Sequence, residues 1–258
     1  MDSGAGSDDV AARDRLGADG GTRGGSRCRC DAHQNAAAES AAIESLPDGD
    51  RREMAHPDEI PRGYLADVAL ARLLAGNRRF VRGKARFPSV RKEILASLAR
   101  RQQPYATILG CSDSRVPPEL VFDAGFGDLF IIRVAGNVIA GEVLGTLQYA
   151  ALHLRTPLFV VLGHEGCGAV DAALATLHHG KMHGRHIARL IENMLPGLQG
   201  VSRLPPDLQR SAAIEANVRW SMQQIRATRE GRVRTKEGIV KLVGAICEIQ
   251  TGRVRFLA

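Results

Sequence analysis

The sequence predicts an α/β protein: a central, mostly parallel β-sheet flanked by helices, with an N-terminal helical arm and a C-terminal strand hairpin. Three observations predict this class. Short apolar runs recur along the chain, helix-length amphipathic segments separate them, and Thr251-Gly252 joins the last two runs. Continuous apolar runs are typical of strands buried on both faces, and their alternation with helices favours parallel pairing.

The first part of the chain differs in composition from the rest. Residues 1–60 are rich in Gly and charged side chains and hold few large apolar residues, so we expect them to be disordered. Met54 directly precedes the apolar part, which suggests the hypothesis that translation starts there and that 1–53 is not translated. The predicted division is therefore an extension over 1–60 and one folded domain over 61–258.

Helices are expected where apolar residues recur with a period near 3.6. The first is the arm, in which Leu65, Val68, Ala69 and Leu73 share one face. Proline and glycine at 196–197 and two prolines at 205–206 are expected to interrupt the last helical region. In chain order the predicted helical segments are 65–80, 91–101, 142–154, 167–177 and 185–229.

Strands are expected where short apolar runs end at turn residues. The three predicted parallel strands are 105–110, 129–134 and 158–163. The hairpin is expected from 239–249 and 253–257.

Charge and hydropathy narrow the possible partners. The chain holds 35 Lys and Arg against 28 Asp and Glu, a net charge of +7. These basic residues are scattered without interleaved aromatics, which favours a solvated surface and no nucleic-acid partner. No apolar stretch reaches the roughly 18 residues of a membrane span, and no signal-peptide pattern is present. The sequence therefore predicts a cytoplasmic protein with no membrane partner.

The five cysteines do not form a disulfide framework. Cys28, Cys30 and His33 offer a possible metal site in the extension, but a second ligand pair is missing, so a site there is disfavoured. Cys247 lies in an apolar run and is expected to be a small buried side chain. The remaining two cysteines occur beside a histidine in a more informative pattern.

Candidate metal ligands directly follow two predicted strands. Cys111 follows the first strand, and His164 and Cys167 follow the third. The carboxyl ends of parallel strands meet at one edge of a sheet, so these side chains are expected to converge. Two thiolates and one imidazole form a zinc site with an open fourth position, typical of catalytic zinc. The start of the following helix is expected to favour the thiolate of Cys167.

The alternative is two buried cysteines and a core histidine. Glycines at 110, 163, 166 and 168 flank all three, which favours a site that backbone approaches closely, and hence zinc. Asp113 and Arg115 alternate with Cys111 and would point the same way in an extended chain. Their pair either orients a zinc-bound water or fills the open position through the carboxylate; a merely structural ion pair is the alternative. Zinc chemistry here indicates a hydrolase or hydratase.

These motifs resemble those of the β-class carbonic anhydrases. The resemblance covers roughly 65–257 and depends on 111–115 (Cys-Ser-Asp-Ser-Arg), 163–170 (Gly-His-Glu-Gly-Cys-Gly-Ala-Val) and 133–137 (Arg-Val-Ala-Gly-Asn). It implies a zinc lyase with one Zn²⁺ per chain, which reversibly hydrates carbon dioxide to bicarbonate and a proton through a zinc-bound hydroxide. Cys111, His164 and Cys167 would bind the metal.

The resemblance also implies roles for further residues. Asp113 and Arg115 would form the catalytic dyad, and Gln102 would donate a hydrogen bond to substrate. Phe130 and Tyr149 would line an apolar pocket, partly across a subunit boundary, so a homodimer or homotetramer is expected. Gly168 would offer an N–H near the metal. Ala135 stands where the family often has Val, which would enlarge the pocket.

Rival interpretations stay open at this point. An enzyme that hydrolyses carbonyl sulfide or carbon disulfide would use the same metal site, and fold does not decide between substrates. A non-catalytic zinc-binding protein is less favoured because Asp113 and Arg115 are both present. The histidines of the loop after 177 could move protons or bind a second metal, but a solvated loop is favoured; they are His178, His179, His183 and His186.

Overall fold

The computed structural model describes residues 62–86, 95–96 and 98–257. The extension over 1–60, with Cys28, Cys30, His33 and Met54, lies outside the described residues, as do residues 91–94 and 97 of the helix expected over 91–101. Of that helix, Leu95, Ala96 and Leu98 are helical. Among the described helices, none is long and apolar enough to cross a membrane.

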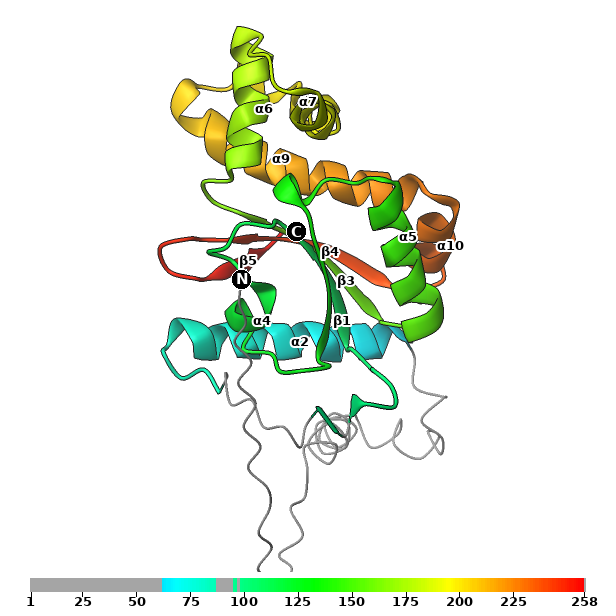
Figure 1. The fold of residues 1–258 in the computed structure, drawn as a ribbon. Helices are drawn as coiled ribbons and strands as arrows, with labels where there is room; N and C mark the ends of the chain where they lie inside the picture. The colour runs from blue at the N-terminus through cyan, green and yellow to red at the C-terminus, as the bar shows by residue number, and fades with distance from the viewer. Residues whose placement is uncertain (1–61, 87–94, 97, 258) are drawn as a thin grey trace, which may run out of the picture.

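A five-stranded sheet with the order β2-β1-β3-β4-β5 forms the centre of the molecule (Figure 1). The strands are β1 (Ala106–Gly110), β2 (Leu129–Arg133), β3 (Leu158–His164), β4 (Lys241–Cys247) and β5 (Val254–Phe256). The first four run parallel, and β5 pairs antiparallel with β4. The predicted mostly parallel sheet and the C-terminal hairpin are confirmed.

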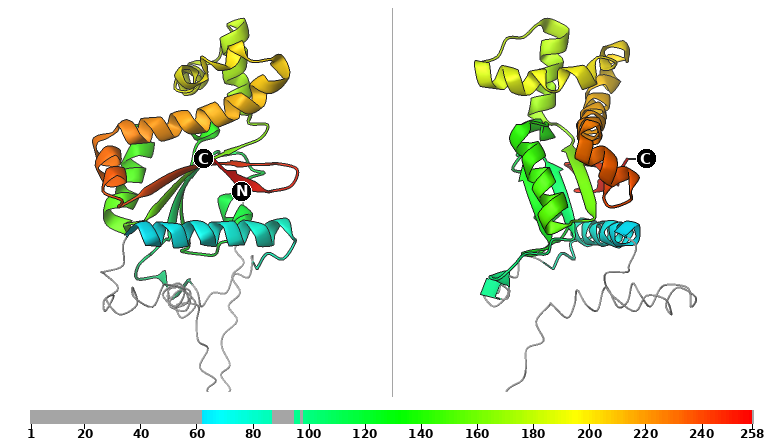
Figure 2. Two further views of the ribbon diagram at one scale, coloured as in Figure 1. Left: turned by 180° about the vertical axis from the view of Figure 1, so that it is seen from behind. Right: turned by 90° about the vertical axis from the view of Figure 1, so that its right-hand side faces the viewer.

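Helices cover both faces of this sheet (Figure 2). The arm, α2 (Arg62–Val81), lies along one face with the short α4 (Pro118–Val121). The opposite face packs against α5 (Gly141–Tyr149), α6 (Gly168–His179) and α9 (Pro206–Ala227). In Figure 1, α6 and α7 (Arg185–Glu192) rise beyond α9 at the top of the molecule, away from the sheet.

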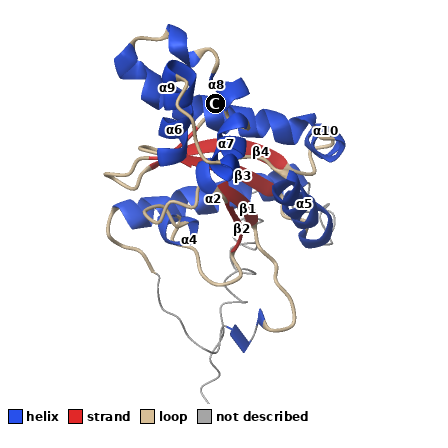
Figure 3. Cartoon of the chain, turned by 45° about the horizontal axis from the view of Figure 1, so that its top comes forward, coloured by secondary structure: helices blue, strands red, loops and turns tan. Residues whose placement is uncertain are grey.

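The strands, drawn in red in Figure 3, lie between helices. They divide their side chains between two apolar cores, one on each face of the sheet. Ile108, Val160 and Leu162 pack toward α2 and α4, whereas Leu109 and Val161 pack toward α9. All five are at most 2% exposed, and full burial of one such side chain contributes roughly 1.5–3 kcal/mol. The period of two along each strand therefore explains why the apolar runs are continuous.

Close packing of α9 fixes the position of β3. A Cβ atom at Gly163 would lie 2.6 Å from Cγ2 of Val218, so only glycine lets the helix approach this strand. Gly163 immediately precedes His164. The contact between α9 and β3 therefore fixes the position of the His164 backbone at the end of the strand.

The structure also departs from the predicted helices. The segment 142–154 is not one α-helix: α5 is followed by the π-helix η4 (Ala150–Leu154), which ends at Arg155 in the left-handed conformation with φ 55°. The expected interruption of the segment 185–229 is confirmed, because it consists of α7, α8 (Leu195–Leu198), η5 (Val201–Arg203) and α9. A further helix, α10 (Arg229–Lys236), was not predicted; Thr228 caps it by accepting a hydrogen bond from the Gly231 N–H.

Candidate metal centre

The three predicted ligands converge at the carboxyl edge of the sheet. Cys111 follows β1, His164 is the last residue of β3, and Cys167 is the N-cap residue of α6. Their ligand atoms all lie within 4.8 Å of one another, and each residue is at most 6% exposed. Segments 53 residues apart in the sequence thus form one buried group because β1 and β3 are parallel neighbours.

The donor atoms fit a zinc ion. The sulfurs of Cys111 and Cys167 are 3.9 Å apart, close to the ~3.8 Å that two zinc–sulfur bonds at a tetrahedral angle give. His164 Nδ1 lies 2.9 Å from the Glu165 carbonyl oxygen, which assigns the proton to Nδ1 and leaves Nε2 as the free lone pair. That Nε2 atom is buried and has no hydrogen-bond partner among the described residues. A metal ion held by this group would provide that partner.

The two thiols influence each other strongly. A hydrogen bond from Cys167 is the largest cause that lowers the pKa of Cys111, to about 4. The same bond, together with burial, raises the pKa of Cys167 far above its ordinary value. The N–H groups of Ala169 and Val170 at the start of α6 do lower the pKa of Cys167, as expected, but they are outweighed. A cation bound between them would favour the thiolate form of both sulfurs.

Asp113 and Arg115 form a two-pronged ion pair beside this group. Arg115 Nε lies 2.9 Å from Oδ1 and Nη2 lies 2.7 Å from Oδ2, and the Arg115 N–H also bonds Oδ1. These bonds hold the pKa of Asp113 well below its usual range. The segment turns instead of extending, because the Val116 N–H bonds the Asp113 carbonyl. Asp113 Oδ2 consequently lies 3.8 Å from His164 Nε2.

Arg133, which was not predicted as a site residue, braces the loop between the ligand and the acid. Its Nε atom donates to the Cys111 carbonyl at 3.0 Å and its Nη2 atom to the Asp113 carbonyl at 2.5 Å. Arg133 is the last residue of β2 and pairs with Gly110 at the end of β1. Its place at the end of a strand on the same sheet edge was the available signal.

The predicted pocket residues Gln102, Phe130 and Tyr149 lie away from the metal ligands of the same chain. Phe130 pairs with Thr107, four residues or about 13 Å of strand before Cys111. The Tyr149 ring lies 6.1 Å from the Phe130 ring, and Tyr149 shares a pocket with Gln102 and His153. We call the aromatic residues Phe130 and Tyr149, together with the neighbouring Gln102, the aromatic cluster. Within one chain it lies toward the opposite end of β2 from the metal ligands.

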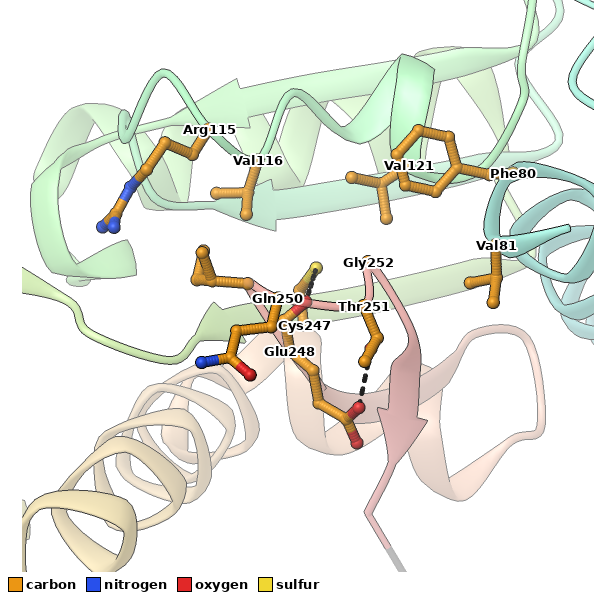
Figure 4. A pocket seen from close by; sticks show the side chains of 11 residues that line it. Phe80, Val81, Arg115, Val116, Val121, Cys247, Glu248, Gln250, Thr251 and Gly252 are labelled. Atoms are coloured by element: carbon orange, nitrogen blue, oxygen red, sulfur yellow. Dashed lines mark hydrogen bonds between the residues drawn. The ribbon is translucent and has the colours of Figure 1, made fainter. Parts of the chain in front are cut away.

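Gly168 and Cys247 occupy the surroundings of the metal group. Gly168 is exposed and begins α6 directly after Cys167. Cys247 is 1% exposed in β4, as predicted for a small buried side chain. Figure 4 shows Arg115 and Cys247 on the wall of one pocket of about 230 Å³, between the end of α2 and the turn that joins β4 to β5.

The histidines after 177 do not converge on a metal site. Cys111, His164 and Cys167 form the one such group found in the described part of the chain. The rings of His178 and His179 lie 6.1 Å apart at the end of α6, and His186 is exposed on α7. The positions of His178, His179 and His186 agree with the favoured interpretation, a solvated segment, whereas Nε2 of His183 is buried and has no hydrogen-bond partner among the described residues.

Known proteins have sequences similar to this chain. The family model described as "Carbonic anhydrase" matches residues 106–254. Carbonic anhydrase 2 of Mycobacterium tuberculosis is 40% identical over 186 residues, which cover 70% of this chain and 87% of the relative.

Two solved structures of β-carbonic anhydrases resemble this chain. One, named CcaA, is 26% identical, has a TM-score of 0.57, and is matched over 73% of this chain and 91% of its own. The other, the Coccomyxa enzyme in complex with acetazolamide, is 25% identical with a TM-score of 0.56, over 73% of this chain and 86% of its own.

Proposed function

Because the chain belongs to the β-class carbonic anhydrase family, we propose that it reversibly hydrates carbon dioxide to bicarbonate and a proton at a zinc ion held by Cys111, His164 and Cys167. The observation that supports this most directly is the buried group of two thiols and one imidazole, in which His164 Nε2 has no other partner among the described residues.

The donor set suits this chemistry. Zinc held by three protein ligands lowers the pKa of water at its open position to about 7 and so supplies a nucleophile at neutral pH. The thiolates of Cys111 and Cys167 would balance the charge of the dication. The Glu165 carbonyl holds the His164 ring with Nε2 directed at the group.

We assign Asp113 the role of orienting the nucleophile. Arg115 keeps its carboxylate ionised, so Asp113 accepts hydrogen bonds and does not donate them. Arg115 in turn donates to the Gly166 carbonyl at 3.1 Å, which ties the pair to the turn between His164 and Cys167. An accepting oxygen 3.8 Å from a ligand nitrogen holds the O–H of a nucleophile so that its lone pair faces the substrate.

We also propose that a second copy of the chain completes each centre. Phe130 and Tyr149 offer the apolar surface that suits uncharged carbon dioxide. Phe130 lies far along β2 from the ligands of its own chain, and the Tyr149 ring, at the end of α5, lies beside it. Tyr149 is 45% exposed, and β2 is an edge strand whose outer side pairs with no strand among the described residues. A homodimer, or a homotetramer built from such dimers, would bring the aromatic cluster of one copy to the metal ligands of the other.

The cellular location stays a prediction. The described cysteines, Cys111, Cys167 and Cys247, are free thiols, which supports the reducing, cytoplasmic setting expected from the sequence.

Stopped-flow measurement of carbon dioxide hydration tests the main proposal. Zinc-loaded protein, chelated protein and chelated protein refilled with zinc are compared, and metal content is determined in each. We expect about one zinc per chain, rapid hydration that chelation abolishes, and recovery on refilling. Zinc-loaded protein that does not hydrate carbon dioxide from neutral to alkaline pH would contradict the proposal. Faster turnover of carbonyl sulfide or carbon disulfide in a parallel assay would instead favour the sulfur-substrate hydrolase.

A further inference from the structure

A backbone N–H that contacts a metal ligand is held in an unusual conformation. The Gly136 N–H donates to Cys111 Sγ at 3.3 Å. Gly136 lies in the turn η3 (Ala135–Asn137) with φ 68° and ψ 17°, and Asn137 follows with φ 45°. A Cβ at Gly136 would lie 2.9 Å from Met194 Sδ and 3.1 Å from Ala169 Cβ. Two successive left-handed residues are not a preferred state of a chain, so the surroundings must impose it.

Two polar side chains of α9 hold this turn. Asn217 Nδ2 donates to the Gly136 carbonyl at 2.8 Å, and Ser221 Oγ donates to the Asn137 carbonyl at 3.0 Å. The two residues are four apart and therefore lie on one face of the helix. Asn137, Asn217 and Ser221 are each 1% exposed. The turn is thus anchored from inside the core, 81 residues further along the chain.

Asn217 is an unexpected residue for its position. It lies on the buried face of α9 with Ala213, Ile214 and Val218, where the packing calls for an apolar side chain. Its Oδ1 atom is buried and has no hydrogen-bond partner among the described residues, which costs stability. An asparagine that costs stability here is explained by its one strong contact, the bond to Gly136.

We propose that Asn217 is a positioning residue for the metal ligand Cys111. Through the Gly136 carbonyl it fixes the residue whose N–H bonds Sγ, and so it sets the direction in which the sulfur presents its lone pairs. Asn217 itself touches neither metal nor substrate. The proposal rests on the zinc site of the proposed function and not on the identity of the substrate.

The test compares two matched substitutions of a buried asparagine. Asn217→Leu removes the donor to Gly136. Asn77→Leu, the control, removes another buried asparagine, on α2, that donates to the carbonyls of Val121 and Gly252, at 3.0 and 2.8 Å, and accepts from the Val254 N–H at 2.9 Å. Zinc affinity is measured by competition with a chromophoric chelator, and the Co²⁺-substituted proteins are compared by their sulfur-to-cobalt charge-transfer absorption.

We expect Asn217→Leu to bind zinc about 10-fold more weakly, with a shifted charge-transfer band. We expect Asn77→Leu to match the wild type in both readouts even if it unfolds at a lower temperature. If Asn217→Leu has the same zinc affinity and the same band position as the wild type, the proposal is overturned. A wild type that binds no zinc overturns the proposed function together with it, so the two failures are distinguishable.

A measurement on the unmodified protein covers the case in which Asn217→Leu does not fold. In protein loaded with ¹¹³Cd, an N–H bonded to a ligand sulfur shows scalar coupling to the metal. A coupling at the Gly136 amide, retained when the temperature is raised to the onset of unfolding, supports a turn held firmly against Cys111. Absence of any coupling at Gly136 overturns the proposal.

Discussion

Oδ2 of Asp113 and Nε2 of His164 lie 3.8 Å apart, with the carboxylate fixed by two bonds from Arg115 and the imidazole fixed by the Glu165 carbonyl. An acceptor and a metal-ligand nitrogen thus face one small volume from two rigid supports. When polar groups are held in place in this way before the reaction, removing one of them has a large effect on the rate.

Replacing Asp113 should therefore affect turnover far more than metal binding. We expect Asp113→Asn to lower kcat/KM for carbon dioxide hydration by about 10²-fold or more at unchanged zinc content, because the amide can donate where the carboxylate only accepts. Asp171→Asn is the matched control: Asp171 also pairs with an arginine, Arg210, but on the surface of α6. Equal activity of the Asp113 variant and the wild type in stopped-flow assays would remove Asp113 from the mechanism.

Mixing two inactive proteins should restore activity if a second copy completes each centre. His164→Ala lacks a metal ligand, and a Gln102→Ala, Tyr149→Ala double variant lacks much of the aromatic cluster. A mixed pair has one centre in which both halves are intact. After subunit exchange at equal concentrations we expect about a quarter of wild-type activity, since half of the dimers are mixed and each has one working centre. No recovery, with exchange verified by native mass spectrometry, would show that each chain works alone.

The contact between β3 and α9 should tolerate no side chain at Gly163. We expect Gly163→Ala to lower the free energy of unfolding by about 1–3 kcal/mol in urea titrations, because its Cβ would lie 2.6 Å from Val218. Gly145→Ala is the control, since Gly145 is an exposed position of α5 where an added Cβ would meet no atom within 4 Å. That control should raise stability by up to about 1 kcal/mol. Equal effects of the two would refute the packing argument.

Acid should weaken the link between α9 and β5. Hydrogen bonds from Arg219 and Arg255 lower the pKa of Glu215. A carboxylate whose folded pKa is depressed stabilises the protein fully above its unfolded pKa, about 4.3, and loses this effect as the pH falls through the folded value. The stability gap between wild type and Glu215→Gln, below about 1 kcal/mol at this partly exposed site, should therefore be constant from pH 6 to 8 and close below pH 4. A gap that widens toward acid pH would contradict this assignment.

Much of the fold could be predicted because the relevant signals are local. The strands around Ile108 and Val160 are apolar on both faces, and such runs are typical of a sheet buried on both sides. The metal ligands could be predicted for the same reason: Cys111 and His164 end parallel strands, so their meeting follows from topology.

Other features depend on contacts that no local pattern encodes. The left-handed Arg155, which ends the π-helix, is not a glycine, so the break after Tyr149 has no signal in the sequence. The bond between Asn217 and Gly136 joins residues 81 apart, and its one trace is a polar side chain on an apolar helix face. The pKa shifts of Cys111 and Cys167 are opposite and depend on the contact between the two sulfurs. The start of a helix beside Cys167 does not by itself predict them.

The distance along β2 between Arg133 and Phe130 has a genetic consequence. If each copy lends its aromatic cluster to the other and keeps its own ligands, a mutant allele that damages one of these halves spoils one centre of a mixed pair and spares the other. Such an allele would lower total activity only in proportion to its dose. An allele that damages both halves of the same chain would silence both centres of every mixed pair, and only that class would behave as dominant-negative.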